Sequence, residues 1–414
     1  MYSKHVLGNG IRVLCEKVDG VRSVSVGVWA GAGSRFESEE NNGVSHFLEH
    51  MLFKGTRTRS AKQIAEEIDA IGGQINAFTG KECTCYYTKT LDECLDVGID
   101  ILSDIILNPK LAKHDINVER NVIIEEINMY EDSPEDIVHD ILTTQMWGGS
   151  PLGMPVLGTV ESLSSIDKPC LRDYISQKYI PSNMVISAAG SFDEEELIKK
   201  LEKKFARLKM NDISPPFPDK PKFCKGVAIK RKDTEQVHIC IGMKGIEAGN
   251  DDIYIFNLIN YIFGGGMSSI LFQKIREELG LVYSIYSYAS AFKNAGQFVI
   301  YAGMNPDQLE RVYALIWDEL ARFKSTGLNE DSLQKAKEQF RGNYLLSLEG
   351  SMSRMNSLGK SELQLGYVRT PEEILKKIDK ITLKAANELI DGIINEKDFA
   401  IAAVGKVDKS LFKQ

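Results

Sequence analysis

Apolar and polar positions along the chain fall into two successive blocks with the same order of elements. In the first block, the spacing predicts strands at 23–29, 75–79 and 83–88 and helices at 42–53, 61–71 and 91–106. The second block repeats this order, with strands at 237–242, 281–288 and 296–302 and helices at 253–263, 269–279 and 306–323. We therefore expect a duplicated α+β protein of two domains, each a largely antiparallel sheet packed with helices.

A proline-rich segment separates the two blocks. Four prolines lie between residues 215 and 221, where they can continue neither a helix nor a central strand. The predicted division is an N-terminal domain at 1–212, a linker at 213–224 and a C-terminal domain at 225–414.

The predicted helix at 42–53 carries an unusual polar face. Its apolar residues follow the i, i+3, i+4, i+7, i+8 spacing of a face that packs on a core: Val44, Phe47, Leu48, Met51 and Leu52. His46, Glu49 and His50 project from the other side, and two imidazoles one turn apart can bind one metal ion. The order HxxEH leaves Glu49 beside the ligands, where it can accept a proton from water held at the metal. The alternative is a solvated helix face that happens to contain two histidines.

A hydrolytic zinc site needs a third protein ligand, and the helical segment 114–130 offers candidates. Glu119 and Glu126 lie seven residues apart, in the middle of an arc of apolar residues: Ile116, Val118, Val122, Ile123, Ile127, Met129 and Tyr130. Glu125 projects about 100° away, so Glu126 is the better ligand. Alternatively, one or both carboxylates pair with a Lys or Arg such as Arg120.

Composition and charge exclude some classes of protein. The formal net charge of −8 argues against a nucleic-acid binder, and no apolar run has the length of a membrane helix. The start of the chain leaves no room for a signal peptide, and the seven cysteines are scattered, so we expect a cytoplasmic protein. Cys83 and Cys85 share one strand face, where buried thiols are favoured over a thiolate metal site.

These motifs together resemble the insulinase/pitrilysin zinc metallopeptidases. The closest likeness is to the short-chain branch, which includes bacterial processing proteases and the mitochondrial processing peptidase beta subunit. The resemblance rests on His46–His50 followed by Met51–Thr56, and on Glu126 at 126 − 50 = 76 residues beyond His50, preceded by Glu119-Arg120-Asn121. It covers nearly the whole chain.

The resemblance assigns roles to these positions. It implies that one Zn²⁺ per chain is bound by His46, His50 and Glu126, with Glu49 as general base and Glu119 as a supporting carboxylate. Residues 72–79 are similar to the family's edge strand, so Asn76, Ala77 and Phe78 are expected to bind the substrate backbone. The alternative for this segment is an ordinary hairpin strand.

A second signature lies in the C-terminal half, over 269–284. Arg276 and Tyr283 fall on the family's Arg and Tyr, which would bind substrate and stabilise the oxyanion. The alternative, from residue type and position alone, is that Arg276 is a surface residue of a helix and Tyr283 a residue of a sheet. The helix at 253–263, the counterpart of the zinc helix, has no His or Glu, so one metal site per chain is expected. The family further implies a clamshell of two domains around a closed chamber, and a homodimer whose active site is completed by the partner subunit.

The predicted function is that of a zinc-dependent endopeptidase that hydrolyses unstructured peptides or leader segments. The first alternative is a non-catalytic, zinc-holding peptide-binding or scaffold subunit. The second is a metal-binding or transport protein that uses the histidine pair. Neither nucleic acid nor a membrane is expected as a partner.

Overall fold

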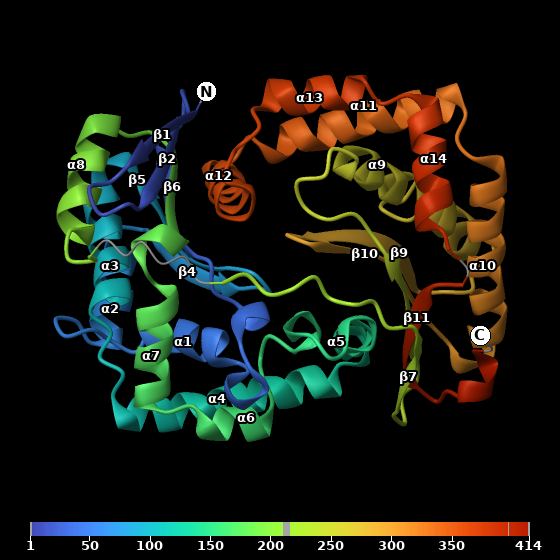
Figure 1. Ribbon diagram of the computed structural model, residues 1–414, viewed down its shortest axis with the longest axis horizontal. Helices are drawn as coiled ribbons and strands as arrows, with labels where there is room; N and C mark the ends of the chain where they lie inside the picture. Colours follow the sequence, from blue (N-terminus) through green and yellow to red (C-terminus); the bar gives the residue numbers. More distant parts are fainter. Residues whose placement is uncertain (1, 210–215, 396, 413–414) are drawn as a thin grey trace. The chain divides into compact units, whose positions relative to one another are not determined.

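The computed structural model describes residues 2–209, 216–395 and 397–412, and confirms the α+β class (Figure 1). By contact, the chain forms two compact units. Unit 1 comprises Met1–Ile127, Met154–Pro218 and Leu346–Thr370, and unit 2 comprises Asn128–Gly153, Asp219–Leu345 and Pro371–Gln414. Each unit contains one sheet.

The sheet of unit 1 has the order β1-β2-β6-β3-β5-β4. Only β2 and β6 are parallel neighbours, and the other pairs are antiparallel. The strands are β1 (Tyr2–Val6), β2 (Arg12–Lys17), β3 (Ser23–Ala30), β4 (Gln74–Thr79), β5 (Thr84–Leu91) and β6 (Met184–Gly190). The sheet therefore ends at β4, which is an edge strand.

Helices cover both faces of this sheet. The larger core is shared by the inner strands with α1, α3 and α8, and includes Val26, Val28, Phe47 and Leu102. The helices are α1 (Val44–Leu52), α2 (Ala61–Ala70), α3 (Leu95–Leu107), α4 (Lys113–Asp132), α6 (Val160–Ser165), α7 (Lys168–Lys178), α8 (Glu194–Phe205) and α12 (Ser351–Leu365). Because both faces are covered, nearly every residue of β3 is buried, as its continuous apolar run requires.

The sheet of unit 2 repeats the arrangement of the first without β1. Its order is β7-β11-β8-β10-β9, with one parallel pair, β7–β11, in the place of β2–β6. The strands are β7 (Gly226–Arg231), β8 (Val237–Lys244), β9 (Ser284–Phe292), β10 (Ala295–Met304) and β11 (Phe399–Gly405). This shared topology supports the duplication predicted from the order of elements.

The helices of unit 2 surround its sheet. They are α5 (Pro134–Trp147), α9 (Ile253–Phe263), α10 (Leu309–Thr326), α11 (Glu330–Ser347), α13 (Pro371–Asp379) and α14 (Leu383–Ile393). The helix expected at 269–279 is wound as a π-helix over Phe272–Glu278. Short 3₁₀ turns occur at Ser34–Phe36, Glu39–Asn41, Asp92–Cys94, Pro151–Gly153, Pro181–Asn183, Pro306–Gln308 and Lys409–Leu411.

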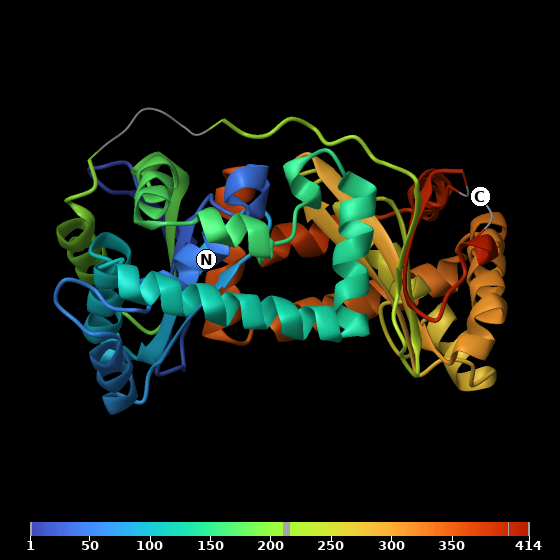
Figure 2. The ribbon, with the colours of Figure 1, turned by 90° about the horizontal axis from the view of Figure 1, so that it is seen from below.

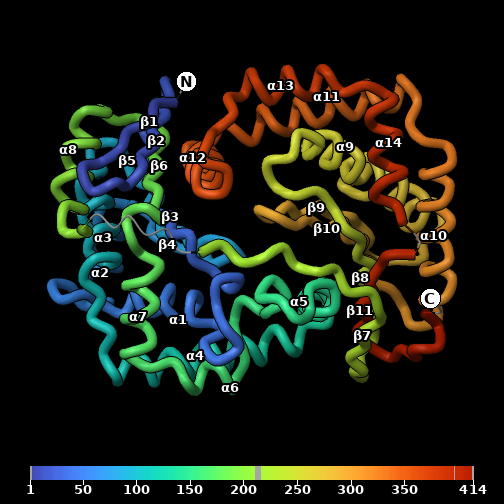
Figure 3. The backbone as a smooth tube through the Cα atoms, in the orientation of Figure 1, coloured from blue at the N-terminus to red at the C-terminus, as the bar shows by residue number. Residues whose placement is uncertain are grey.

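Each sheet receives one covering helix from the other half of the sequence. Helix α12 packs on β3 and β6 of unit 1 (Figure 3), and α5 packs on β8 and β11 of unit 2 (Figure 2). The close approach depends on glycines in equivalent strands: a Cβ on Gly27 would collide with Met355, and one on Gly242 with Met146. Periodicity alone does not show this exchange.

The predicted linker lies partly outside the described residues, which omit 210–215. Residues 216–225 have no regular secondary structure (Figure 2). Among the helices of the described residues, none combines the length and the apolarity that crossing a membrane requires.

Candidate metal centre

Helix α1 begins at a glycine, and its first turn is capped from a distance. Gly43 has φ 92°, a left-handed conformation that glycine adopts without strain, and it provides no side-chain cap. Glu37 takes over this role: its carboxylate accepts the N–H of Gly43 at 2.7 Å and that of Ser45 at 2.9 Å, and the Asn42 amide at 2.9 Å. Glu37 is buried, and burial raises its pKa, although these hydrogen bonds work in the opposite direction.

The predicted apolar face of α1 is confirmed. Val44, Phe47, Leu48, Met51 and Leu52 are buried in the main core of unit 1. His46 is buried on another side of the helix, whereas Glu49 and His50 are half-buried.

Helix α4 brings Glu119 and Glu126 to this face of α1. The buried stripe is narrower than predicted and consists of Ile116, Glu119 and Ile123. The prediction was wrong for Val118, Val122, Met129 and Tyr130, which are exposed, because one face of α4 packs on the core and they lie outside it. Glu125 is exposed and Glu126 half-buried, as the helical spacing indicates.

The donor atoms of His46, His50 and Glu126 converge. All three lie within 4.8 Å of one another, and Nε2 of each histidine is 3.7 Å from Glu126 Oε2. Among the described residues, this is the only group of three or more His, Cys, Asp or Glu side chains close enough to hold one ion. Two imidazoles and one carboxylate are a ligand set of catalytic zinc sites, so the residues fit this metal.

Burial shifts the pKa values of three ionisable groups in the cluster. Burial, with a smaller contribution from His50, lowers the pKa of His46 to about 4, so its imidazole is neutral and able to bind a metal at neutral pH. Burial also raises the pKa of Glu126. The pKa of Glu49 is raised by burial, and a hydrogen bond from Thr79 and the charge of His50 oppose this shift.

Glu119 supports His50 from behind. Its Oε2 lies 3.1 Å from His50 Nδ1, and its Oε1 lies 2.6 Å from Lys54 Nζ. A carboxylate on Nδ1 leaves Nε2 of the same ring for the metal. The alternative of a Lys or Arg partner therefore holds for Glu119, with Lys54 as the partner. Arg120 instead donates to the carbonyls of Leu163 and Ile166.

The edge strand β4 lies beside α1 (Figure 1). Along it, Asn76 and Phe78 are exposed, Ala77 is half-buried, and the Ala77 N–H is bonded to Asn76 Oδ1 at 2.8 Å. Phe78 meets Trp29 edge-on, with ring centroids 5.6 Å apart. The last residue of the strand, Thr79, donates to Glu49 Oε2 at 2.5 Å.

Arg276 and Tyr283 lie in unit 2. Arg276 is part of the π-helix, and its guanidinium lies 4.6 Å from the ring centre of Phe272. Tyr283 is 76% exposed, and its N–H donates to Gly303 O. Their role at the metal centre stays a prediction.

All seven cysteines are free thiols, and Cys83 and Cys85 are buried, in keeping with a packing role.

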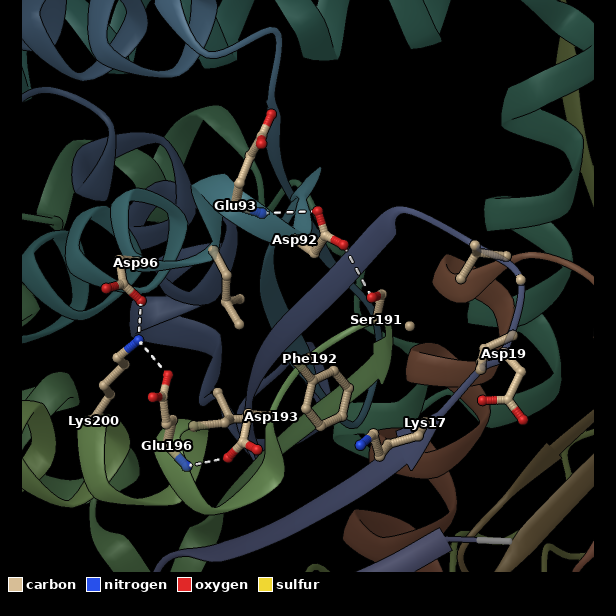
Figure 4. A pocket seen from close by; sticks show the side chains of 16 residues that line it. Lys17, Asp19, Asp92, Glu93, Asp96, Ser191, Phe192, Asp193, Glu196 and Lys200 are labelled. Atoms are coloured by element: carbon tan, nitrogen blue, oxygen red, sulfur yellow. Dashed lines mark hydrogen bonds and ion pairs between the residues drawn. The ribbon is translucent and has the colours of Figure 1, made fainter.

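A pocket of about 500 Å³ lies elsewhere in unit 1, at the ends of β2 and β6 (Figure 4). Several of its charged side chains already have partners, and Asp92 and Glu93 pair with Arg22, which lies outside the lining. Lys200 pairs with Asp96 and Glu196, Asp92 accepts from Ser191, and Asp193 caps α8. The pocket is lined by none of the predicted site residues.

Three residues of the site were not found from the sequence: Glu37, Lys54 and Thr79. The glycine at the start of α1 indicates that a cap must come from elsewhere, but Glu39 and Glu40 are equally near. Lys54 directly follows the C-cap of α1 and Thr79 is the last residue of β4, and their contacts with Glu119 and Glu49 exist only in the folded chain.

Fold and site together define a duplicated α+β protein with a His–His–Glu metal centre in its first sheet domain. Residues 12–160 match the family described as Insulinase (Peptidase family M16), and residues 165–340 match the Peptidase M16 inactive domain. The chain belongs to this family of zinc-dependent peptidases.

Relatives along the full length bear names that agree with the metal centre. The chain is 43% identical over 404 residues to YmxG of Bacillus subtilis (strain 168), called an uncharacterized zinc protease, with 98% of each chain covered. It is 38% identical over 403 residues to the uncharacterized zinc protease ML0855 of Mycobacterium leprae (strain TN), covering 96% of this chain and 90% of the relative.

Solved structures share the fold. A protease from Helicobacter pylori superposes with a TM-score of 0.91 at 20% identity, covering 98% of this chain and 99% of that one. A protein from Pseudomonas fluorescens, described as a peptidase M16 inactive domain, also gives 0.91 at 18% identity, with 98% of each chain covered.

Proposed function

We propose that the protein is a zinc-dependent endopeptidase that hydrolyses unstructured peptides or leader segments. The observation that carries the proposal is the convergence of His46, His50 and Glu126 within 4.8 Å, with Glu49 on the same helix as the two histidines. A purely structural metal site does not require a carboxylate such as that of Glu49 beside its ligands, whereas hydrolysis requires a base at that position.

Each residue of the centre has a distinct role in this proposal. One zinc ion per chain, bound by His46, His50 and Glu126, supplies the Lewis acidity that activates water and polarises the scissile carbonyl. Glu49 accepts the proton of the attacking water and returns it to the leaving amine. Glu119 holds the His50 ring by its Nδ1.

The substrate would bind as an extra strand on β4. An edge strand offers main-chain groups that pair with an extended peptide irrespective of its side chains. The Asn76 amide now covers the Ala77 N–H, so it would turn aside as the peptide pairs with Ala77 and Phe78. Folded proteins do not present such a free strand, which favours unstructured segments as substrates.

Arg276 and Tyr283 would complete the site from the partner subunit of a homodimer. A guanidinium and an exposed phenol are able to bind a substrate carbonyl and an oxyanion.

The decisive experiment compares purified wild type, Glu49→Gln and the exposed control Glu39→Gln on a mixed set of unstructured peptides, with metal content measured for each. We expect cleavage by the wild type and by Glu39→Gln, no cleavage by Glu49→Gln, and about one zinc per chain in all three. If the wild type holds zinc and cuts none of the peptides, the non-catalytic peptide-binding or scaffold subunit replaces this proposal. Readily exchanged metal without cleavage would instead favour a metal-transport protein.

A further inference from the structure

The end of the edge strand touches the carboxylate that the proposed function uses as its base. Thr79 Oγ1 lies 2.5 Å from Glu49 Oε2, although the two residues are 30 positions apart in the chain. Thr79 is the last residue of β4, and its half-buried side chain lies on the same side of the strand as those of Ile75 and Ala77.

The neighbouring hydroxyl fixes the direction of this hydrogen bond. Thr84, which is opposite Thr79 in the β4–β5 pair, is buried and donates its proton to Ala32 O at 3.0 Å. Its oxygen lies 3.4 Å from Thr79 Oγ1, a longer contact than the one to Glu49. The single proton of Thr79 is therefore directed to Glu49, and the carboxylate is held through Oε2.

The strand end that carries Thr79 is itself firmly held. Gly80 N–H bonds to Cys83 O at 2.8 Å across the turn, and Arg35 N–H bonds to Lys81 O at 2.9 Å. The side chains of Arg35 and Glu82 form a buried ion pair at 2.5 Å. A hydroxyl on such a turn has little freedom to move away from its acceptor.

We propose that Thr79 is a positioning residue that orients the base Glu49 and ties it to the strand on which the substrate binds. With Oε2 held by Thr79, Oε1 is presented for proton transfer. The inference rests on the proposed function, because it concerns the base of that reaction.

The test uses a pair of substitutions that differ in the hydroxyl. Thr79→Val keeps the shape of the side chain and removes the donor, whereas Thr79→Ser keeps the donor and removes a methyl group. For Thr79→Val we expect kcat to fall about tenfold, a part of the 10²–10⁴-fold that a positioned base contributes. KM and zinc content should remain within about twofold of wild type, because neither ligands nor strand pairing change. Thr79→Ser should keep most of kcat.

A crystal structure of each variant supplies a readout that does not need activity. We expect the Glu49 carboxylate to keep its orientation in Thr79→Ser and to lose it in Thr79→Val. An unchanged kcat together with an unchanged Glu49 rotamer in Thr79→Val would overturn the proposal, and so would an equal loss in both variants. If the wild type cuts no peptide, the proposed function fails, while the Glu49 orientation in the crystals still decides whether Thr79 positions this carboxylate.

Discussion

Lys54, one residue beyond the C-cap of α1, forms an ion pair with Glu119 at 2.6 Å. The other carboxylate oxygen of Glu119 lies 3.1 Å from His50 Nδ1. Glu119 is buried, and burying a carboxylate without a partner is costly. Lys54 is the only Lys or Arg within 4.0 Å of it among the described residues. The metal centre thus includes a supporting chain of ammonium, carboxylate and imidazole.

The first prediction concerns the contacts of Glu119 with Lys54 and His50. Glu119→Gln replaces the charged acceptor by a neutral amide, which binds His50 Nδ1–H less strongly and leaves Lys54 without its counter-ion. We expect zinc affinity to fall about 10–100-fold. Chelator competition measures it, with the exposed neighbour Glu125→Gln as a control that should bind zinc like the wild type. Equal affinity in both variants would show that Glu119 does not support His50.

The second prediction concerns the cap of the zinc helix. Glu37→Ala removes the acceptor of the Gly43 and Ser45 N–H groups, which are buried, so we expect a loss of about 2–4 kcal/mol in the free energy of unfolding. Glu37→Gln retains one acceptor oxygen and should lose less. Urea unfolding measures both, and the exposed Glu39→Ala should change stability by less than about 0.5 kcal/mol. A wild-type stability for Glu37→Ala would mean that water caps α1 equally well.

The third prediction is a pH dependence of stability at Asp104. Burial alone would raise the pKa of Asp104, but hydrogen bonds from Thr56, Thr58, Asn108 and Arg59 outweigh burial and hold it below its ordinary range. A carboxyl whose pKa is lower in the folded state stabilises the fold above its unfolded pKa of about 3.9, and this contribution is lost as the pH falls through the folded-state pKa.

Asp104→Asn should therefore cost about 1–3 kcal/mol at pH 7. The difference between wild type and variant should shrink as the pH falls below about 4. Urea unfolding at a series of pH values measures it. A difference that stays constant over this range would show that the charge of Asp104 is not what stabilises the segment after α1.

The fourth prediction uses two glycines in helices. Gly342, in α11, is exposed and has open space at its Cβ position, so Gly342→Ala should stabilise the protein by about 0.5–1 kcal/mol. Gly359, in α12, faces Trp29, and an added Cβ would collide with the buried indole. Overpacking costs about 1–3 kcal/mol and exceeds the gain in helix propensity, so Gly359→Ala should destabilise. Thermal unfolding compares the two, and stabilisation by both would show that α12 does not pack closely on the sheet.

The candidate ligands were identifiable in the sequence because their signals are local. His46 and His50 are one helical turn apart, and the seven-residue spacing of Glu119 and Glu126 places both on one face of α4. The order of elements was likewise enough to predict two similar sheet domains.

Long-range packing was not predictable in the same way. The periodicity of α12 and α5 shows that each has an apolar face but does not say which sheet it covers, and both cover the sheet of the other sequence half. Val118 and Val122 show the same limit, because an apolar residue on a helix is not bound to be buried. Glu37 accepts three hydrogen bonds around the start of α1, and Thr79 donates one to a residue 30 positions away, and neither arrangement leaves a pattern in the sequence.

The last prediction tests whether two subunits share a site. If Arg276 acts on the zinc centre of its partner, an Arg276→Ala chain and a Glu49→Gln chain are each inactive as homodimers. A mixed dimer, however, contains one intact site, which combines Glu49 of the first chain with Arg276 of the second. Random exchange makes half of the dimers mixed, so about a quarter of the wild-type activity should return on mixing. Differently tagged chains show by co-purification that subunits have exchanged, and each variant exchanged with itself is the control. Exchange without recovered activity would place Arg276 in the site of its own chain or outside the site altogether.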